Sequence, residues 1–275
     1  MFTVPGLNRI CRESYNNPTE VYDRLKQMSM SVVTITDHDS IDGAEILRRH
    51  PDFFLSEEVT VQMPSGTEIH MGVYGITESE HLEIQRRRND FIALLMYLTE
   101  RKLFFSANHV FSGLTGRREE KDFHWLESYV PAFETRNGQM WAGANESAAR
   151  LAAQLGSDSH AIAGLGHTYT EVPGARTVDE FFAGLRTGCG GIHGTHGSCR
   201  KLTADVFSIV RSLFWDKPWT LALSPFALLV PAFTAGHWMN EIRFCRKWTA
   251  AIERGEKRKR MLWDLDSNFG ANWAN

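Results

Sequence analysis

Imidazole and carboxylate side chains occur close together at four places in the chain. These places are Asp37-His38-Asp39, Glu57-Glu58, Asn108-His109 and Asp158-Ser159-His160. Imidazole and carboxylate without thiolate form the ligand set of a catalytic Zn, Mn or Fe centre rather than of a structural zinc site. Two or more such cations polarise a phosphoryl oxygen and lower the pKa of a bound water from ~15.7 toward ~7. The residue types therefore indicate hydrolysis assisted by two or more divalent metal ions.

The elements that must position these groups alternate between strand and helix over the first two-thirds of the chain. Apolar and β-branched runs predict strands at 32–36, 53–61, 69–76, 103–107 and 132–135. Capping residues and apolar periodicity predict helices at 18–28, 77–98, 145–155 and 177–188. This alternation is typical of a parallel α/β architecture, in which a barrel gathers its strand ends onto one rim. We therefore expect the four groups to converge there.

Four motifs carry a resemblance to a known family. They are Thr36-Asp37-His38-Asp39, Leu55-Ser56-Glu57-Glu58-Val59-Thr60, Ser106-Ala107-Asn108-His109 and Gly156-Ser157-Asp158-Ser159-His160-Ala161. Their order within residues 18–190 resembles that of the PHP (polymerase and histidinol phosphatase) family. The resemblance implies a metal-dependent phosphoesterase built on a distorted (β/α)7 TIM-like barrel. It also implies a set of metal ligands: His38, Glu58, His109, Asp158 and His160.

Further residues are expected to act on the substrate. Asp37 or Asp39 would orient His38 or handle a proton. The resemblance also places a histidine near the site in the 68–74 strand, which is His70, and a polar residue after the 132–135 strand, which is Asn137.

Three more candidates follow from position along the chain. Arg117 and Arg118 come after the 103–107 strand, and arginine suits phosphate recognition, although two solvated loop charges fit equally well. His167 follows the last motif, where it either contacts the substrate or is an ordinary loop residue.

The first motif of the family, a strand that ends in His-x-His, has no counterpart here, because His38 is the first histidine in the chain. Either the true start of the protein lies upstream of Met1, or the barrel lacks its first strand and part of its metal site. We expect this incomplete barrel domain to cover residues 1–205, and a C-terminal helical extension, apolar and then basic, to cover 206–275.

The extension contains a long uncharged segment. No Asp, Glu, Lys or Arg occurs within residues 218–240, and Trp215, Trp219 and Trp238 lie at or near its ends. One interpretation is a pair of short helices packed on the barrel. The other is contact of residues 215–260 with a membrane surface, because tryptophans and the basic residues that follow suit the interface with anionic lipid.

Composition narrows the function classes. The net charge of −3 argues against a dedicated nucleic-acid partner, and the four cysteines form no CxxC pair. With no secretory signal visible, these features favour a cytoplasmic protein, free or associated with a membrane, that acts on a small phosphorylated molecule or nucleotide. Two functions remain open: a hydrolase of phosphomonoesters or phosphodiesters that uses metal-activated water, and a catalytically impaired PHP-like barrel that serves as a metal-binding or membrane-associated interaction protein.

Overall fold

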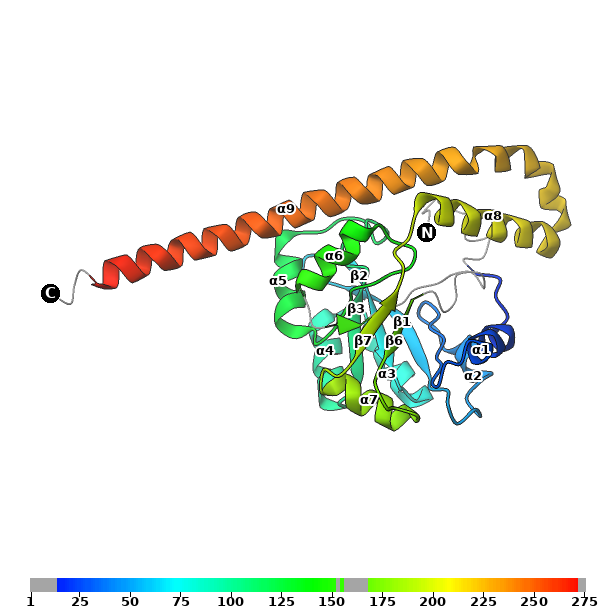
Figure 1. The fold of residues 1–275 in the computed structure, drawn as a ribbon, viewed down its shortest axis with the longest axis horizontal. Helices are drawn as coiled ribbons and strands as arrows, with labels where there is room; N and C mark the ends of the chain where they lie inside the picture. The colour runs from blue at the N-terminus through cyan, green and yellow to red at the C-terminus, as the bar shows by residue number, and fades with distance from the viewer. Residues whose placement is uncertain (1–13, 152–153, 156–167, 272–275) are drawn as a thin grey trace.

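The protein has a mixed α/β architecture with a long helical hairpin on one side (Figure 1). The computed structural model describes residues 14–151, 154–155 and 168–271. The helices are α1 Pro18–Gln27, α2 Asp42–Glu45, α3 Glu78–Arg87, α4 Phe91–Glu100, α5 Glu120–Tyr129, α6 Ala142–Leu151, α7 Val178–Arg186, α8 Cys199–Asp216, the 3-10 helix η3 Pro218–Leu229, and α9 Val230–Ala271. The strands are β1 Ser56–Gln62, β2 Glu68–Tyr74, β3 Phe104–Asn108, β4 Phe133–Glu134, β5 Gln154–Leu155, β6 Thr168–Glu171 and β7 Gly191–Gly194.

The strands form two sheets. The larger sheet has the order β1-β2-β3-β4-β5, with antiparallel pairing from β1 to β3 and parallel pairing from β3 to β5. The smaller sheet pairs β6 with β7 in antiparallel fashion. Within the described residues these strands do not close into a barrel.

Alternation of side chains gives the larger sheet two unlike faces, because successive residues of a strand point to opposite sides. Val59, Met71 and Phe105 lie on the core face and are buried together with apolar side chains of α3, α4 and α5. Glu58 and His70 lie on the opposite face, which we call the site face. The same periodicity that builds the core therefore presents polar side chains on the other side.

The segment at 32–36, expected to be a buried strand, is not assigned as a strand. It runs beside β1 with only two isolated parallel bridges, Val33 to Phe53 and His38 to Glu58. Between them the Thr34 hydroxyl donates to the carbonyl of Phe54, at 2.7 Å. That carbonyl is the acceptor that the next ladder amide would need, so the side chain interrupts the backbone pairing.

Two further expectations are corrected. The helix expected at 77–98 is two helices, α3 and α4, because the Asp90 side chain accepts hydrogen bonds from the amides of Ile92 and Ala93 and caps a new helix. The helix expected to run to 155 ends at Leu151, and β5 follows and pairs parallel with β4. A strand thus leads into the Gly156 motif.

The C-terminal extension is a helical hairpin of long helices rather than a pair of short ones, and its second helix packs against α5 and α6 as the packed interpretation expected. Helix α8 and the long helix α9 lie side by side, joined by η3 (Figure 1). The expected domain boundary at 205/206 falls inside α8.

Candidate metal centre

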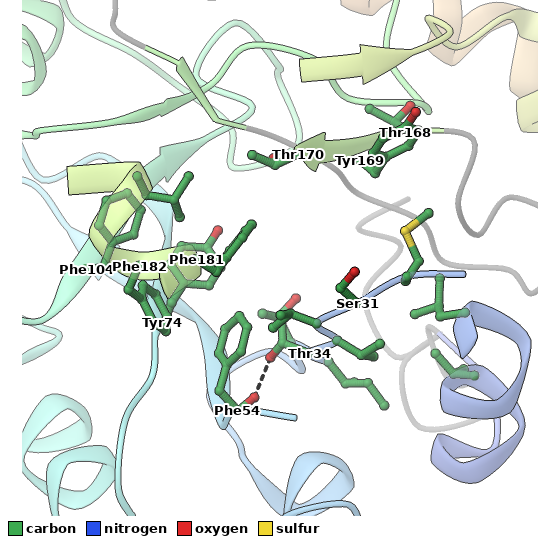
Figure 2. Close-up of a pocket in the computed structure, with 18 of the residues that line it drawn as sticks. Ser31, Thr34, Phe54, Tyr74, Phe104, Thr168, Tyr169, Thr170, Phe181 and Phe182 are labelled. Atoms are coloured by element: carbon green, nitrogen blue, oxygen red, sulfur yellow. Dashed lines mark hydrogen bonds between the residues drawn. The ribbon is translucent and has the colours of Figure 1, made fainter. Parts of the chain in front are cut away.

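A hollow of about 770 Å³ lies at the site face of the sheet (Figure 2). Its walls come from the 31–38 segment, β6, α7 and the strands beneath. The aromatic side chains Tyr74, Phe104, Phe181 and Phe182 gather at one end, and β6 lies across from Ser31 and Thr34. Of the described residues that line the hollow none is Arg or Lys, whereas Asp37, Glu58 and Glu171 are acidic.

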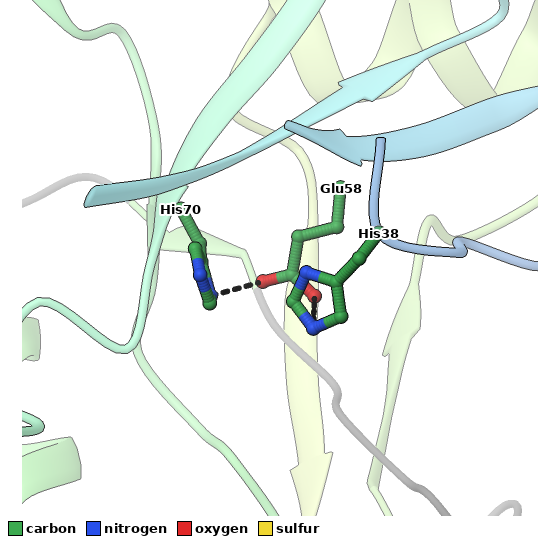
Figure 3. A group of neighbouring side chains, drawn as sticks. All are labelled: His38, Glu58 and His70. Carbon is green, nitrogen blue, oxygen red and sulfur yellow. Dashed lines mark ion pairs between the residues drawn. The ribbon is translucent and has the colours of Figure 1, made fainter. Parts of the chain in front are cut away.

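His38, Glu58 and His70 meet at the floor of this region (Figure 3). One potential ligand atom from each lies within 4.8 Å of the others. The two imidazoles approach different oxygens of one carboxylate: His38 Nε2 is 3.7 Å from Glu58 Oε2, and His70 Nδ1 is 3.4 Å from Oε1. We call these three residues the His–Glu–His cluster; they can hold a metal ion.

Sheet register explains why Glu58 and His70 meet. Glu58 on β1 is opposite Gly72 on β2, and His70 is two residues before Gly72, on the same face. Gly72 contributes no side chain there, and a Cβ at this position would lie 2.2 Å from the Tyr74 hydroxyl. The glycine therefore leaves room for the Tyr74 side chain beside the carboxylate.

His109 extends the cluster. It follows β3 with a φ of 32°, a left-handed backbone that is uncommon outside glycine. Its Nε2 is 2.8 Å from His70 Nδ1 and 3.6 Å from Glu58 Oε1, while its Nδ1 is 3.3 Å from Glu134 Oε2. Glu134 also accepts a hydrogen bond from the His109 amide and two from the Asn137 side chain. A buried carboxylate thus holds the backbone of His109 and lies beside its ring.

Burial lowers the pKa of His70, and the neighbouring His109 and His38 act in the same direction, while Glu58 opposes them. A lowered pKa keeps the imidazole neutral near pH 7. Neutral imidazole is the form that binds metal, so the environment of His70 favours ligation.

A chain of hydrogen bonds orients Glu58. The Tyr74 hydroxyl is 3.1 Å from Ser106 Oγ, which donates to Asn108 Oδ1 at 2.8 Å. Asn108 Nδ2 in turn donates to Glu58 Oε1 at 3.1 Å. All four side chains project from the site face of adjacent strands, so the sheet fixes the carboxylate.

The two aspartates that flank His38 make contacts that hold the turn. The Asp37 carboxylate accepts a hydrogen bond from the Gly43 amide at the start of α2. Asp39 has a φ of 54°, accepts from the Thr60 amide, and forms an ion pair with Arg88. These contacts position the turn that carries His38.

The remaining expected residues fall into three groups. Arg118 is buried, donates to the Glu68 carbonyl and the Thr115 hydroxyl, and has a pKa lowered by burial to about 10. Arg117 is exposed, and neither arginine lines the hollow. Asn137 is buried behind Glu134. Asp158, His160 and His167 lie outside the described residues.

The structure adds supporting roles for residues that were not named as candidate ligands. Glu134 beside His109, and the Tyr74–Ser106–Asn108 chain, support the cluster directly. Period-two alternation from Glu58 along β1 to β3 is the signal that could have found the Tyr74–Ser106–Asn108 chain, but it does not extend to Glu134 on β4.

The donor set fits a divalent cation. Two imidazoles and a carboxylate converge, with a third imidazole adjacent, and no thiolate lies among these groups. Each of Glu58 and His109 has an orienting partner, as metal ligands usually do. Such a site beside a hollow can bind a cation and a small molecule together. Neither the comparison with protein-family models nor that with curated proteins gives a match to this chain.

Proposed function

We propose that this protein is a metal-dependent phosphoesterase that hydrolyses a phosphomonoester or phosphodiester of a small molecule or nucleotide. The observation that carries the proposal is the convergence of His38, Glu58 and His70 within 4.8 Å, with His109 adjacent. In the sequence these residues are far apart, and each lies in or directly after an extended segment. Bound divalent cations in such a site would polarise an ester oxygen and acidify water.

The protein's own groups supply position and proton handling. Asn108 and Glu134 hold Glu58 and His109 in fixed orientations, which limits the reorganisation needed during reaction. The hydrogen bond between His70 and His109 lets a proton reside on either ring. The hollow accommodates the remainder of the substrate against its aromatic wall.

The charge of the hollow narrows the proposed substrate. Asp37, Glu58 and Glu171 line it, and no described lining residue is a Lys or Arg. A polyanion would meet repulsion that only bound cations offset. We therefore favour a substrate with one phosphoryl group and an apolar or aromatic remainder.

The resemblance to the PHP family supports the same proposal and extends it to fold. Parallel pairing from β3 to β5, and functional side chains at or just after strand ends, as in His109 and Glu134, fit an opened or partial (β/α)7 barrel. We accordingly propose that the sheet is part of such a barrel.

The test measures metal and turnover in the same preparation. We expect stoichiometric Mn or Zn after loading, and hydrolysis of p-nitrophenyl phosphate or bis-p-nitrophenyl phosphate that depends on it. His38→Ala should abolish turnover and lower metal content, whereas His124→Ala, on the exposed side of α5, should change neither. Failure to bind metal, or equal behaviour of the two variants, would refute the proposal.

A second candidate function is metal binding without turnover. The buried side chain of Arg118 favours this candidate. Arg118 was expected to bind phosphate, but its guanidinium donates hydrogen bonds to protein groups instead. Stoichiometric metal that is lost in His38→Ala, with no turnover on either ester, would select this candidate.

A further inference from the structure

The bend of the helical hairpin carries a large exposed apolar surface. We call residues 215–233 the hairpin tip; Figure 1 shows this region, η3 and the adjoining helix ends, projecting beyond the α/β body. Trp215 is 78% exposed and Leu228 is 82% exposed. More than a third of the surface is also exposed for Trp219, Leu221, Leu223, Phe226, Leu229 and Phe233. An apolar patch of this extent marks an interaction site.

The hairpin has a separate buried face, so the exposed side chains are not an unpacked core. Ile209, Leu213 and Val230 are buried between its limbs, and Thr203 Oγ1 lies 2.7 Å from Thr234 Oγ1. The base is held to the body by Glu241, which accepts from the Ser112 hydroxyl at 2.6 Å. The tip is therefore presented outward on a fixed support.

Charge around the tip distinguishes between classes of partner. Residues 218–240 contain no Asp, Glu, Lys or Arg. Between residues 205 and 250 the exposed charges of the two limbs are mainly basic: Arg211, Arg243, Arg246 and Lys247, against Asp216. The nearby acids Asp205 and Glu241 bond to Gln139 and Ser112. A basic margin on a chain whose net charge is −3 is complementary to an anionic surface.

Tryptophan placement points to lipid. Trp215 and Trp219 are exposed at the N-terminal end of the uncharged segment, and the half-buried Trp238 lies near its C-terminal end. Tryptophan is enriched at the boundary between headgroups and acyl chains, and basic residues beside an apolar surface bind anionic headgroups. The apolar hairpin tip, the tryptophans near its ends and the basic residues beside it therefore match a membrane interface.

The hairpin geometry fixes how deep the contact is. By length and composition alone, the helical segment Pro218–Gly255 is sufficient to cross a membrane. However, the chain reverses at η3, so both limbs leave on the same side (Figure 1). From Val230 to Asn240 helix α9 rises ~15 Å before Arg243, about half of a ~30 Å hydrocarbon core. We propose that the hairpin tip inserts into one leaflet of a membrane rich in anionic lipid and does not span it.

Vesicle sedimentation of the full chain tests this proposal. The wild type should sediment with phosphatidylserine/phosphatidylcholine vesicles and much less with phosphatidylcholine alone. The double variant Phe226→Ser/Leu228→Ser should partition roughly tenfold or more weakly, because it removes two large inserted side chains. Both positions are exposed, so folding should be unchanged by circular dichroism. Ile46→Ser, at a site 64% exposed but remote from the tip, is the matched control.

Two further experiments test the role of the basic residues and the depth to which the hairpin tip inserts. Arg243→Glu/Lys247→Glu should abolish the preference for anionic vesicles, whereas Arg49→Glu should retain it. Brominated lipids should quench tryptophan fluorescence when bromine lies near the headgroup end of the acyl chain, more than when it lies at the bilayer centre, and Trp219→Phe should reduce this quenching.

Three results would overturn the proposal. The first is no sedimentation with either kind of vesicle, and the second is an equal loss of vesicle binding in Ile46→Ser. The third is strongest quenching at the bilayer centre together with resistance to carbonate extraction, which indicates a transmembrane span. A dimer in light scattering that dissociates in Phe226→Ser/Leu228→Ser, without vesicle binding by the wild type, would assign the tip to self-association instead.

Discussion

The two adjacent glutamates of β1 lie on opposite faces of the central sheet and have different surroundings. Glu57 points into the core face, is fully buried, and has Oε2 2.9 Å from His81 Nδ1 and 2.7 Å from Gln85 Nε2. Glu58 points to the site face, between His38 and His70. One acid is enclosed by a helix, and the other faces a hollow. The same residue type therefore has a structural or a ligating role according to the face it occupies.

The difference also appears in the partners of each acid. Glu57 receives one imidazole and one amide, both from α3, and one of its oxygens, Oε1, is buried without a hydrogen-bond partner. Glu58 has three imidazoles around it, from three separate segments. Convergence from distant segments is expected of a binding site, whereas capture by one neighbouring helix is expected of a packing contact.

The largest expected effect comes from damaging the core face. Phe91→Ala removes a 1% exposed ring of α4 that packs edge to face on Trp125, and should lower the free energy of unfolding by ~3–5 kcal/mol in urea titrations. The folded fraction should still bind metal with unchanged stoichiometry, because the ring lies on the opposite side of the sheet. A loss of metal without a loss of stability would contradict the division between the faces.

The next largest effect is expected on the site face. Glu58→Gln removes the charge shared by His38 and His70, and should lower metal affinity by more than ~100-fold, beyond the 10–100-fold typical of groups that only orient ligands. Competition with a fluorescent chelator measures this. Glu57→Gln is the matched control, one residue away on the other face, and should leave affinity unchanged. Equal losses in both variants would remove the distinction.

Much of this arrangement could be predicted from sequence, because local signals coincide with the final structure. Asn17 and Thr77 cap α1 and α3 as expected, and β1, β2 and β3 lie where apolar runs indicated. The preference for Glu58 over Glu57 came from the motif, and strand alternation supplies its physical reason. Local chemistry therefore sufficed for most elements.

What the sequence could not give depends on tertiary contacts. The 32–36 run has β-branched residues, yet a single Thr34 hydroxyl interrupts its ladder. Arg118 was a candidate phosphate ligand or a solvated loop charge, but it donates to the Thr115 hydroxyl close by in the chain and to the Glu68 carbonyl, which becomes its neighbour only after folding. The pairing of Glu134 with His109 likewise depends on the register of β3 and β4, which no local pattern encodes.

A smaller effect is expected from the amides that orient the two acids. Asn108→Ala removes the donor to Glu58 Oε1 and should weaken metal binding by roughly 10–100-fold, with little change in stability, because this face borders the hollow. Gln85→Ala removes the corresponding donor to Glu57 and is the control, for which metal affinity should stay constant. Weaker binding in Gln85→Ala than in Asn108→Ala would reverse the assignment of the faces.

The smallest effect is expected on the pH dependence of stability, and it concerns a residue of the core face alone. Burial raises the pKa of Glu57, with His81 and Gln85 opposing it. Above the ordinary Glu pKa of ~4.3, the unfolded chain has released a proton that the folded chain still holds. Folding then takes up a proton, so this group makes the free energy of unfolding fall as pH rises from that value to the raised pKa.

The variant Glu57→Gln has no proton to release at this position. Its free energy of unfolding, relative to that of the wild type, should therefore increase as pH rises from the ordinary Glu pKa to the raised pKa. The gain should be seen when urea titrations at about pH 4 and about pH 8 are compared. Glu68→Gln, on an exposed residue of β2, should show no such change. A difference in stability between Glu57→Gln and wild type that falls with rising pH would mean that Glu57 is ionised and stabilised by His81, and that the core face holds a charged carboxylate.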